Sequence, residues 1–140
     1  MAKIVLVPYH QPYPMTTLPR DCHRTDLGDS QGADAQYRCL DGRWHVRKFK
    51  SRLVAHADRA NPEESLPSHA VLDCQGWVIL TTGLAVGGIV GLRTKDWRKA
   101  TVAGLTGAAI AWVVTEGVRR DWEDRHGDSY VLKLEENGNG

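Results

Sequence analysis

The chain lacks the motifs by which many catalytic domains are recognised. It has no HExxH pair, no GxSxG elbow, no glycine-rich phosphate loop ending in GK[ST] and no EF-hand spacing. Its 18 Lys and Arg residues nearly balance 17 Asp and Glu residues, which leaves a net charge of +1. A dedicated nucleic-acid-binding protein normally has a strong basic excess. We therefore expect a non-enzymatic protein without a bound cofactor, and nucleic acid is not the favoured partner.

Cysteine is scarce, and so are the features of an exported protein. Cys22, Cys39 and Cys74 make an odd number without a CxxC pair, so no disulfide framework can be inferred. Three reduced thiols in the cytosol is the simplest interpretation, and one bridge plus one thiol in an oxidising compartment is the alternative. The apolar run before Pro8 has only four residues, whereas a signal peptide needs about 7–15. We therefore expect the N-terminal part of the chain to stay in the cytoplasm.

The N-terminal half contains a well-specified β-hairpin over residues 36–48. Asp41 and Gly42 are typical of a two-residue turn, and they separate two runs of alternating residues. This turn pairs Cys39 with Trp44 and buries one face of the hairpin. From Phe49 the apolar residues fall at helical spacing, with basic residues between them, and we interpret residues 48–60 as a basic amphipathic helix. The resulting basic face comprises Arg38, Arg43, Arg47, Lys48, Lys50 and Arg52.

This N-terminal segment allows more than one ligand. Basic residues interleaved with aromatic ones fit nucleic acid, but they fit anionic lipid headgroups equally well, and the apolar segments downstream favour lipid. Cys22, His23, Cys39 and His45 also lie in one 24-residue window, and the hairpin looks like the second half of a zinc ribbon. A ribbon needs two ligands at each turn, however, and here each turn has one cysteine. We therefore expect no metal, and a structural Cys39 beside Trp44.

Two uncharged segments, 74–92 and 100–115, dominate the second half of the chain. As helices they would reach about 28 Å and about 24 Å, against about 30 Å for a bilayer core. Small residues recur at every fourth position, which lets two helices approach closely in a membrane. Helical glycine is costly in water, at roughly 1 kcal/mol each relative to alanine. The expected helix-packing residues are Gly83, Gly87 and Gly91 in the first segment, and Ala100, Gly104 and Ala108 with Ala103, Gly107 and Ala111 in the second.

The tryptophans and a short basic connection fit the two membrane interfaces. In a helical hairpin, Trp77 and Trp112 would lie at one interface and Trp97 at the other. The connection contains Arg93, Lys95, Arg98 and Lys99. By the positive-inside rule it would be cytoplasmic, whereas the missing signal peptide favours cytoplasmic termini. We follow the second argument and expect both termini in the cytoplasm of a bacterium, with the hairpin in its inner or plasma membrane.

Together these patterns predict an α+β protein. A small domain over residues 1–67 precedes a helical hairpin over 68–126, and residues 127–140 supply a last strand, which pairs with the first, and a tail. The make-up resembles small membrane proteins encoded by bacteriophages of actinobacteria, and that resemblance implies no activity. We expect a membrane-anchored accessory or regulatory protein that binds lipid and acts by packing its glycine face against itself or another helix. A holin-like pore former, and a soluble virion-assembly subunit with its helices buried in an oligomer, are the alternatives.

Overall fold

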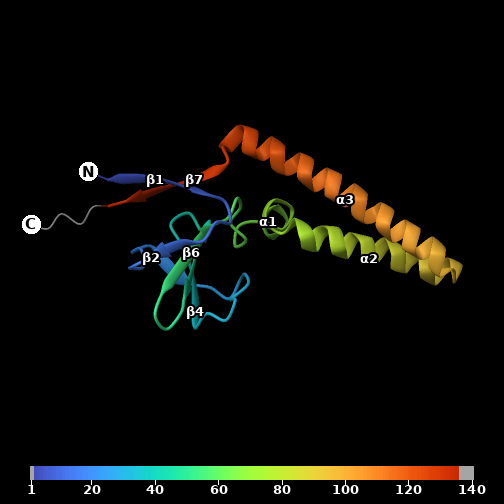
Figure 1. Cartoon of the computed structure of the whole chain (residues 1–140), viewed down its shortest axis with the longest axis horizontal. Coiled ribbons are helices and arrows are strands. Elements are labelled where there is room, and N and C mark those ends of the chain that lie inside the picture. The colour runs from blue at the N-terminus through green and yellow to red at the C-terminus, as the bar shows by residue number, and fades with distance from the viewer. Residues whose placement is uncertain (1, 136–140) are drawn as a thin grey trace, which may run out of the picture. The chain divides into compact units, whose positions relative to one another are not determined.

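The computed structural model describes residues 2–135 of the chain, which divide into two compact units (Figure 1). The β unit consists of Met1–Leu66 and Gly127–Gly140, and the helical unit of Pro67–His126. The described residues form seven strands in two antiparallel sheets and three helices. The predicted α+β class, with a β region followed by a helical hairpin, is confirmed.

The larger sheet of the β unit has five strands in the order β2-β6-β5-β4-β3. The strands are β2 (Tyr13–Met15), β3 (Cys22–Arg24), β4 (Ala35–Cys39), β5 (Trp44–Lys48) and β6 (Leu53–Ala57). The predicted β4–β5 hairpin is present, and its register pairs Cys39 with Trp44 as expected. Its connection is longer than two residues, because Leu40 takes a left-handed conformation with φ of 60° before Gly42 at 79°. Trp44 is fully buried in the middle strand and anchors the core.

The smaller sheet joins the two ends of the chain. Strand β1 (Lys3–Pro8) pairs with β7 (Ser129–Leu134), which confirms the predicted pairing of the first and last strands. Val7, Tyr130 and Leu132 are buried. The Tyr130 ring stacks on Trp44 with centroids 5.7 Å apart, so the two sheets share one core.

The predicted basic helix over residues 48–60 is wrong. Phe49 donates its N–H to the Arg52 carbonyl at 2.9 Å, which closes a turn, and the chain then returns as β6 beside β5. The error has a simple cause. Phe49, Leu53 and Ala57 are spaced by four, which places residues on one face of a strand as well as on one face of a helix. The β-branched Val54 and the tight turn favour the strand.

A disulfide joins Cys22 to Cys39, which are directly opposite each other on β3 and β4. The expectation of three reduced thiols is therefore wrong, and the alternative of one bridge holds, with Cys74 outside it. Cys39 is buried and opposite Trp44, as expected of a structural cysteine.

The helical unit contains α1 (Leu66–Asp73, which begins at the last residue of the β unit), α2 (Gln75–Thr94) and α3 (Trp97–His126). Helix α2 ends where Lys95 adopts a left-handed φ of 52° and donates its N–H to the Gly91 carbonyl at 2.8 Å. Asp96 then caps α3 by accepting the N–H of Arg98 at 2.9 Å. A left-handed residue followed by a side-chain cap lets the chain reverse within two residues, which makes α2 and α3 neighbours in a hairpin.

Candidate functional site

The seam between α2 and α3 is built from small residues. A Cβ atom added to Gly83 would lie 3.0 Å from the Gly104 carbonyl oxygen and 3.1 Å from the Cβ of Ala108. A Cβ at Gly87 would lie only 2.9 Å from the Ala100 carbonyl oxygen. A side chain at Gly87 would force the backbone to shift, and one at Gly83 would require its neighbours to move by a few tenths of an ångström. The two backbones are therefore in close contact.

The structure brings most of the predicted packing residues together within one chain. Gly91 faces Ala100 across the seam, where an added Cβ would lie 3.2 Å from the Ala100 Cβ. Gly107 packs against the side chain of Val86 instead of against a small residue, and Ala111 is half-buried. The helix that occupies the glycine face of α2 is therefore α3 of the same chain.

The outer surface of this hairpin carries large apolar side chains. Leu92 is 84% exposed and Trp77 is 70% exposed, and similar residues surround both helices. This is the reverse of a soluble helical hairpin, which keeps its large apolar side chains inside. The other exposed large apolar residues of the two helices are Leu80, Leu84, Ile89, Trp97, Val102, Leu105, Ile110, Trp112, Val113, Val114 and Val118.

Five of the six threonine hydroxyls on α2 and α3 have hydrogen-bond partners within their own helix. Thr81 donates to the Trp77 carbonyl at 2.7 Å, and Thr106 donates to the Val102 carbonyl at 2.8 Å. Thr94, Thr101 and Thr115 also donate to the carbonyl four residues before them. These hydroxyls need no water, so they do not oppose an apolar environment.

The predicted interface residues are at the two ends of the apolar zone. Gly83 packs between Gly104 and Ala108, and continuing this antiparallel register brings position 77 level with position 112. Trp77 and Trp112 are therefore at one end of the hairpin, and Trp97 is at the other. Arg93, Lys95, Arg98 and Lys99 are exposed at that other end, where the Arg98 guanidinium lies 5.5 Å from the centroid of the Trp97 ring.

Helix α3 is charged where its apolar part ends. Glu116 binds Arg119 at 2.6 Å and Arg120 at 2.8 Å, and Arg119 also binds Glu123 at 2.8 Å. The register of the seam places position 114 level with the first residue of α2, so these ion pairs extend beyond the start of α2. The apolar length of α3 is thus matched to that of α2.

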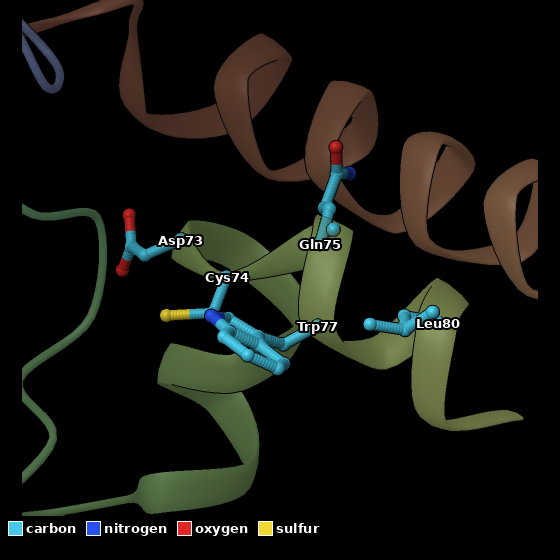
Figure 2. A pocket seen from close by; sticks show the side chains of 6 residues that line it. Asp73, Cys74, Gln75, Trp77 and Leu80 are labelled. Atoms are coloured by element: carbon cyan, nitrogen blue, oxygen red, sulfur yellow. The ribbon is translucent and has the colours of Figure 1, made fainter.

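A shallow hollow of about 440 Å³ lies at the junction of α1 and α2, lined by Asp73, Cys74, Gln75, Gly76, Trp77 and Leu80 (Figure 2). Asp73 is bound to His69 at 3.1 Å, within α1. The hollow offers the indole of Trp77 and the side chain of Leu80, so it continues the apolar surface of the hairpin.

The predicted basic face does not form one exposed surface. Arg38 is 0% exposed, and Arg47 is half-buried with its Nε donating to the Asp29 carbonyl at 2.7 Å. The cause is the loop before β4: a Cβ on Gly28 would lie 3.5 Å from Arg38 Nη2, so this loop covers the face that sequence periodicity left open. Arg43 binds Asp41 at 2.8 Å, and only Lys48, Lys50 and Arg52 of the predicted set are exposed.

A buried polar network, which sequence reasoning missed, occupies this covered face. Asp58 Oδ2 accepts from Arg38 Nη1 at 2.5 Å, and Asp58 Oδ1 lies 3.0 Å from His56 Nε2 and 3.7 Å from His10 Nδ1. Burial alone would raise the pKa of Asp58, but the hydrogen bonds and electrostatic interactions with His56 and Arg38 lower it. The sequence indicates only that His56 and Asp58 are two residues apart, so that their side chains share one face of an extended chain. His10 comes from a separate loop, which no local pattern connects to them.

His45 is the neutral member of the network. Its Nε2 lies 3.0 Å from Gln36 Oε1, and its ring meets the His56 ring edge-on at 4.9 Å. Burial, followed by the positive charge of Arg38, lowers the pKa of His45 to about 3. The residue therefore stays uncharged at physiological pH and serves as a buried hydrogen-bonding group.

Comparison with known proteins adds no family to these observations. No known protein family, curated protein or solved structure matches the chain. The resemblance to phage membrane proteins therefore stays a prediction, and the function has to be argued from the hairpin and the β unit themselves.

The seam predicts unequal effects of leucine at two neighbouring glycines. Gly87→Leu forces a side chain against the Ala100 backbone. We expect it to lower the free energy of unfolding of the helical unit by about 1–3 kcal/mol, and with it the melting temperature. Gly88→Leu is the matched control, because nothing lies within 4 Å of an added Cβ there. Circular dichroism of both variants in detergent measures the difference, and equal melting curves would contradict the seam.

The low pKa of His45 predicts that the β unit loses stability on acidification. The ordinary pKa of 6.5 applies to the unfolded chain, which therefore binds more protons than the folded one between pH 6.5 and about 3. Stability should fall with decreasing pH in that window, by up to about 1.4 kcal/mol per pH unit. Hydrogen exchange of β5 amides in urea at pH 7 and pH 5, corrected for intrinsic rates, measures this slope. The variant His45→Gln should show a smaller change of stability with pH. If the slope is unchanged in this variant, groups other than His45 cause the pH dependence.

Proposed function

We propose that this protein is a non-catalytic membrane-anchored accessory protein whose α2–α3 hairpin is inserted in a bilayer. The observation that carries the proposal is the inverted packing of the hairpin, with glycine and alanine inside and large apolar side chains outside. In lipid no hydrophobic force drives helices together, and close backbone contact through small residues replaces it. The outer side chains then gain about 1.5–3 kcal/mol each on leaving water.

The dimensions of the hairpin fit a bilayer. Helix α2 has 20 residues, which corresponds to about 30 Å and equals the thickness of a hydrocarbon core. Both α2 and α3 are long and apolar enough to cross a membrane. The tryptophans and the charged groups described above then lie at the two interfaces, where aromatic rings and basic residues are favoured.

The two alternatives receive less support. A holin-like pore needs a polar stripe along its helices, but five of the six threonine hydroxyls that could contribute to such a stripe are bonded to their own helix carbonyls. A soluble virion subunit would need partner chains to cover nearly the whole circumference of the hairpin, because exposed apolar residues surround both helices. A bilayer covers this surface without any partner. The accessory role then belongs to the β unit that the hairpin anchors.

Membrane fractionation tests the anchor directly. We expect the protein to stay in the membrane pellet through an alkaline carbonate wash and to leave it only with detergent. The double variant Leu84→Lys with Leu105→Lys, at two exposed positions, should reduce retention, because a lysine near the bilayer centre costs about 3 kcal/mol.

The outcomes separate the three hypotheses. A soluble wild-type protein would eliminate the anchor and leave the assembly subunit. Retention of the lysine variants equal to that of the wild type would also count against insertion, because two lysines at the bilayer centre should weaken it. Collapse of the membrane potential on induction would favour the pore.

The disulfide supports an orientation opposite to the one expected from the sequence. The Cys22–Cys39 bridge is typical of an oxidising compartment. Because β1 pairs with β7, both ends of the chain are on the same side of any membrane that the hairpin crosses. The basic connection over residues 93–99 then faces the cytoplasm, in agreement with the positive-inside rule. The β unit and both termini lie outside the cytoplasm.

Single reporter cysteines test this orientation in right-side-out spheroplasts, in a chain carrying Cys74→Ser. We expect a membrane-impermeant maleimide to label the chain with Ser51→Cys, at an exposed turn of the β unit. The chain with Lys95→Cys should be labelled only after permeabilisation. The reverse pattern would overturn the orientation while leaving insertion intact, and labelling of both chains in intact spheroplasts would argue against a closed hairpin across the membrane.

A further inference from the structure

Three potential metal ligands from separate parts of the β unit converge beside the end of β6. Ligand atoms from His10, His56 and Asp58, one from each, lie within 4.8 Å of one another. The Asp58 Oδ1 atom is 3.0 Å from His56 Nε2 and 3.7 Å from His10 Nδ1. In a tetrahedral zinc site with bonds of about 2.0–2.1 Å, ligand atoms are about 3.3 Å apart. The two separations from Asp58 are therefore close to the spacing that one ion requires.

The carboxylate is already oriented toward the two histidines. Asp58 is 2% exposed, and its second oxygen, Oδ2, is held by Arg38. Arg38 is itself fixed, because its Nη1 also donates to the Gly42 carbonyl at 3.3 Å. The backbone N–H of Asp58 donates to the Arg43 carbonyl at 2.9 Å. A ligand whose other oxygen and backbone are both fixed is preorganised in the way that outer-shell contacts preorganise known metal sites.

The backbone also holds His10 in place. Its N–H donates to the Ala57 carbonyl at 3.0 Å, so the loop after β1 is attached to β6 between His56 and Asp58. His10 has a left-handed φ of 64°, a conformation that non-glycine residues rarely adopt and that here directs the loop toward β6. The His10 side chain is 38% exposed, whereas Asp58 is buried. The cluster thus has a buried floor and one open side, through which an ion and a water ligand could enter.

We propose that His10, His56 and Asp58 form a binding site for Zn²⁺, with water as the fourth ligand. Two imidazole nitrogens and one carboxylate oxygen suit this borderline ion better than Mg²⁺ or Ca²⁺, which prefer sets of oxygen ligands. The site is distinct from the ribbon-like set considered for the sequence. There Cys22 and Cys39 are consumed by the disulfide, and His45 is bonded to Gln36.

Arg47 contacts His56 on the side of the ring away from Asp58, and this contact competes with zinc binding. Its Nη1 lies 3.3 Å from His56 Nδ1, so in the metal-free protein His56 accepts there and donates from Nε2 to Asp58. Zinc requires an unprotonated Nε2, which moves the ring proton to Nδ1, opposite the Arg47 donor. Arg47 therefore has to turn aside when zinc binds. Removing this guanidinium should strengthen binding.

Zinc titration of the full chain in detergent tests the site, with Cys74→Ser in every chain so that this thiol cannot contribute. Calorimetry with ZnCl₂ should give one site per chain, and Co²⁺ should give the absorption bands of tetrahedral coordination.

His10→Ala should weaken zinc binding by about tenfold or more. His10→Gln keeps a polar side chain and should weaken it similarly. His23→Ala is the matched control, because His23 binds Glu63 at 2.7 Å elsewhere in the β unit. Arg47→Gln should tighten binding.

The result can overturn the proposal in two ways. Absence of zinc binding in the parent chain would make the cluster a purely structural network. Equal affinity in the parent chain and in His10→Ala would place the zinc elsewhere. Neither result bears on membrane insertion, which fractionation tests separately.

Discussion

The pairing of β1 with β7 is the constraint on which the rest of the architecture depends. It joins segments more than 120 residues apart in the sequence into one ribbon, with Lys3 opposite Leu134 and Pro8 opposite Ser129. The ribbon supplies Tyr130, whose ring covers Trp44 in the core of the five-stranded sheet. Everything between residues 67 and 126 is consequently an insertion that has to leave the β unit and return to it. A helical hairpin does so with its backbone hydrogen bonds formed within each helix.

The hairpin places different demands on its two surfaces. At the seam, Gly83 and Gly87 allow close backbone contact, which a larger side chain at either position would disturb. On the outside, bulky apolar side chains are exposed, and in water such a surface drives association. The proposed insertion in a bilayer would meet both demands, because lipid would solvate the outer side chains and leave backbone packing to hold the helices together.

The β unit combines a small apolar core with a buried charged network. Arg38 and Asp58 are both buried, so neither tolerates loss of the other: an uncompensated buried charge costs about 3–5 kcal/mol. His45 avoids this cost by remaining neutral, with a pKa of about 3. The disulfide between β3 and β4 limits the unfolded states of the same segment, which supports a sheet too small to rely on apolar burial alone.

Local patterns in the sequence were sufficient for the features that depend on near neighbours. Alternation around Asp41 and Gly42 predicted the β4–β5 register, and the spacing of Gly83, Gly87 and their counterparts on α3 predicted the seam. Both depend on periodicity, which a sequence states directly. The β strand at residues 53–57 was misread because a spacing of four satisfies the helical and the extended periods alike.

Tertiary structure alone decided the features that depend on distant segments. It joined Cys22 to Cys39, brought the loop around Gly28 over Arg38, and set His10 beside Asp58. No local pattern encodes these contacts, because each depends on how separate strands are aligned and on which loop covers the sheet. Sequence patterns were enough to indicate an α+β chain with a glycine-lined apolar hairpin. The burial of Arg38, within the predicted basic face, followed only from the fold, because burial is a property of the surrounding chain.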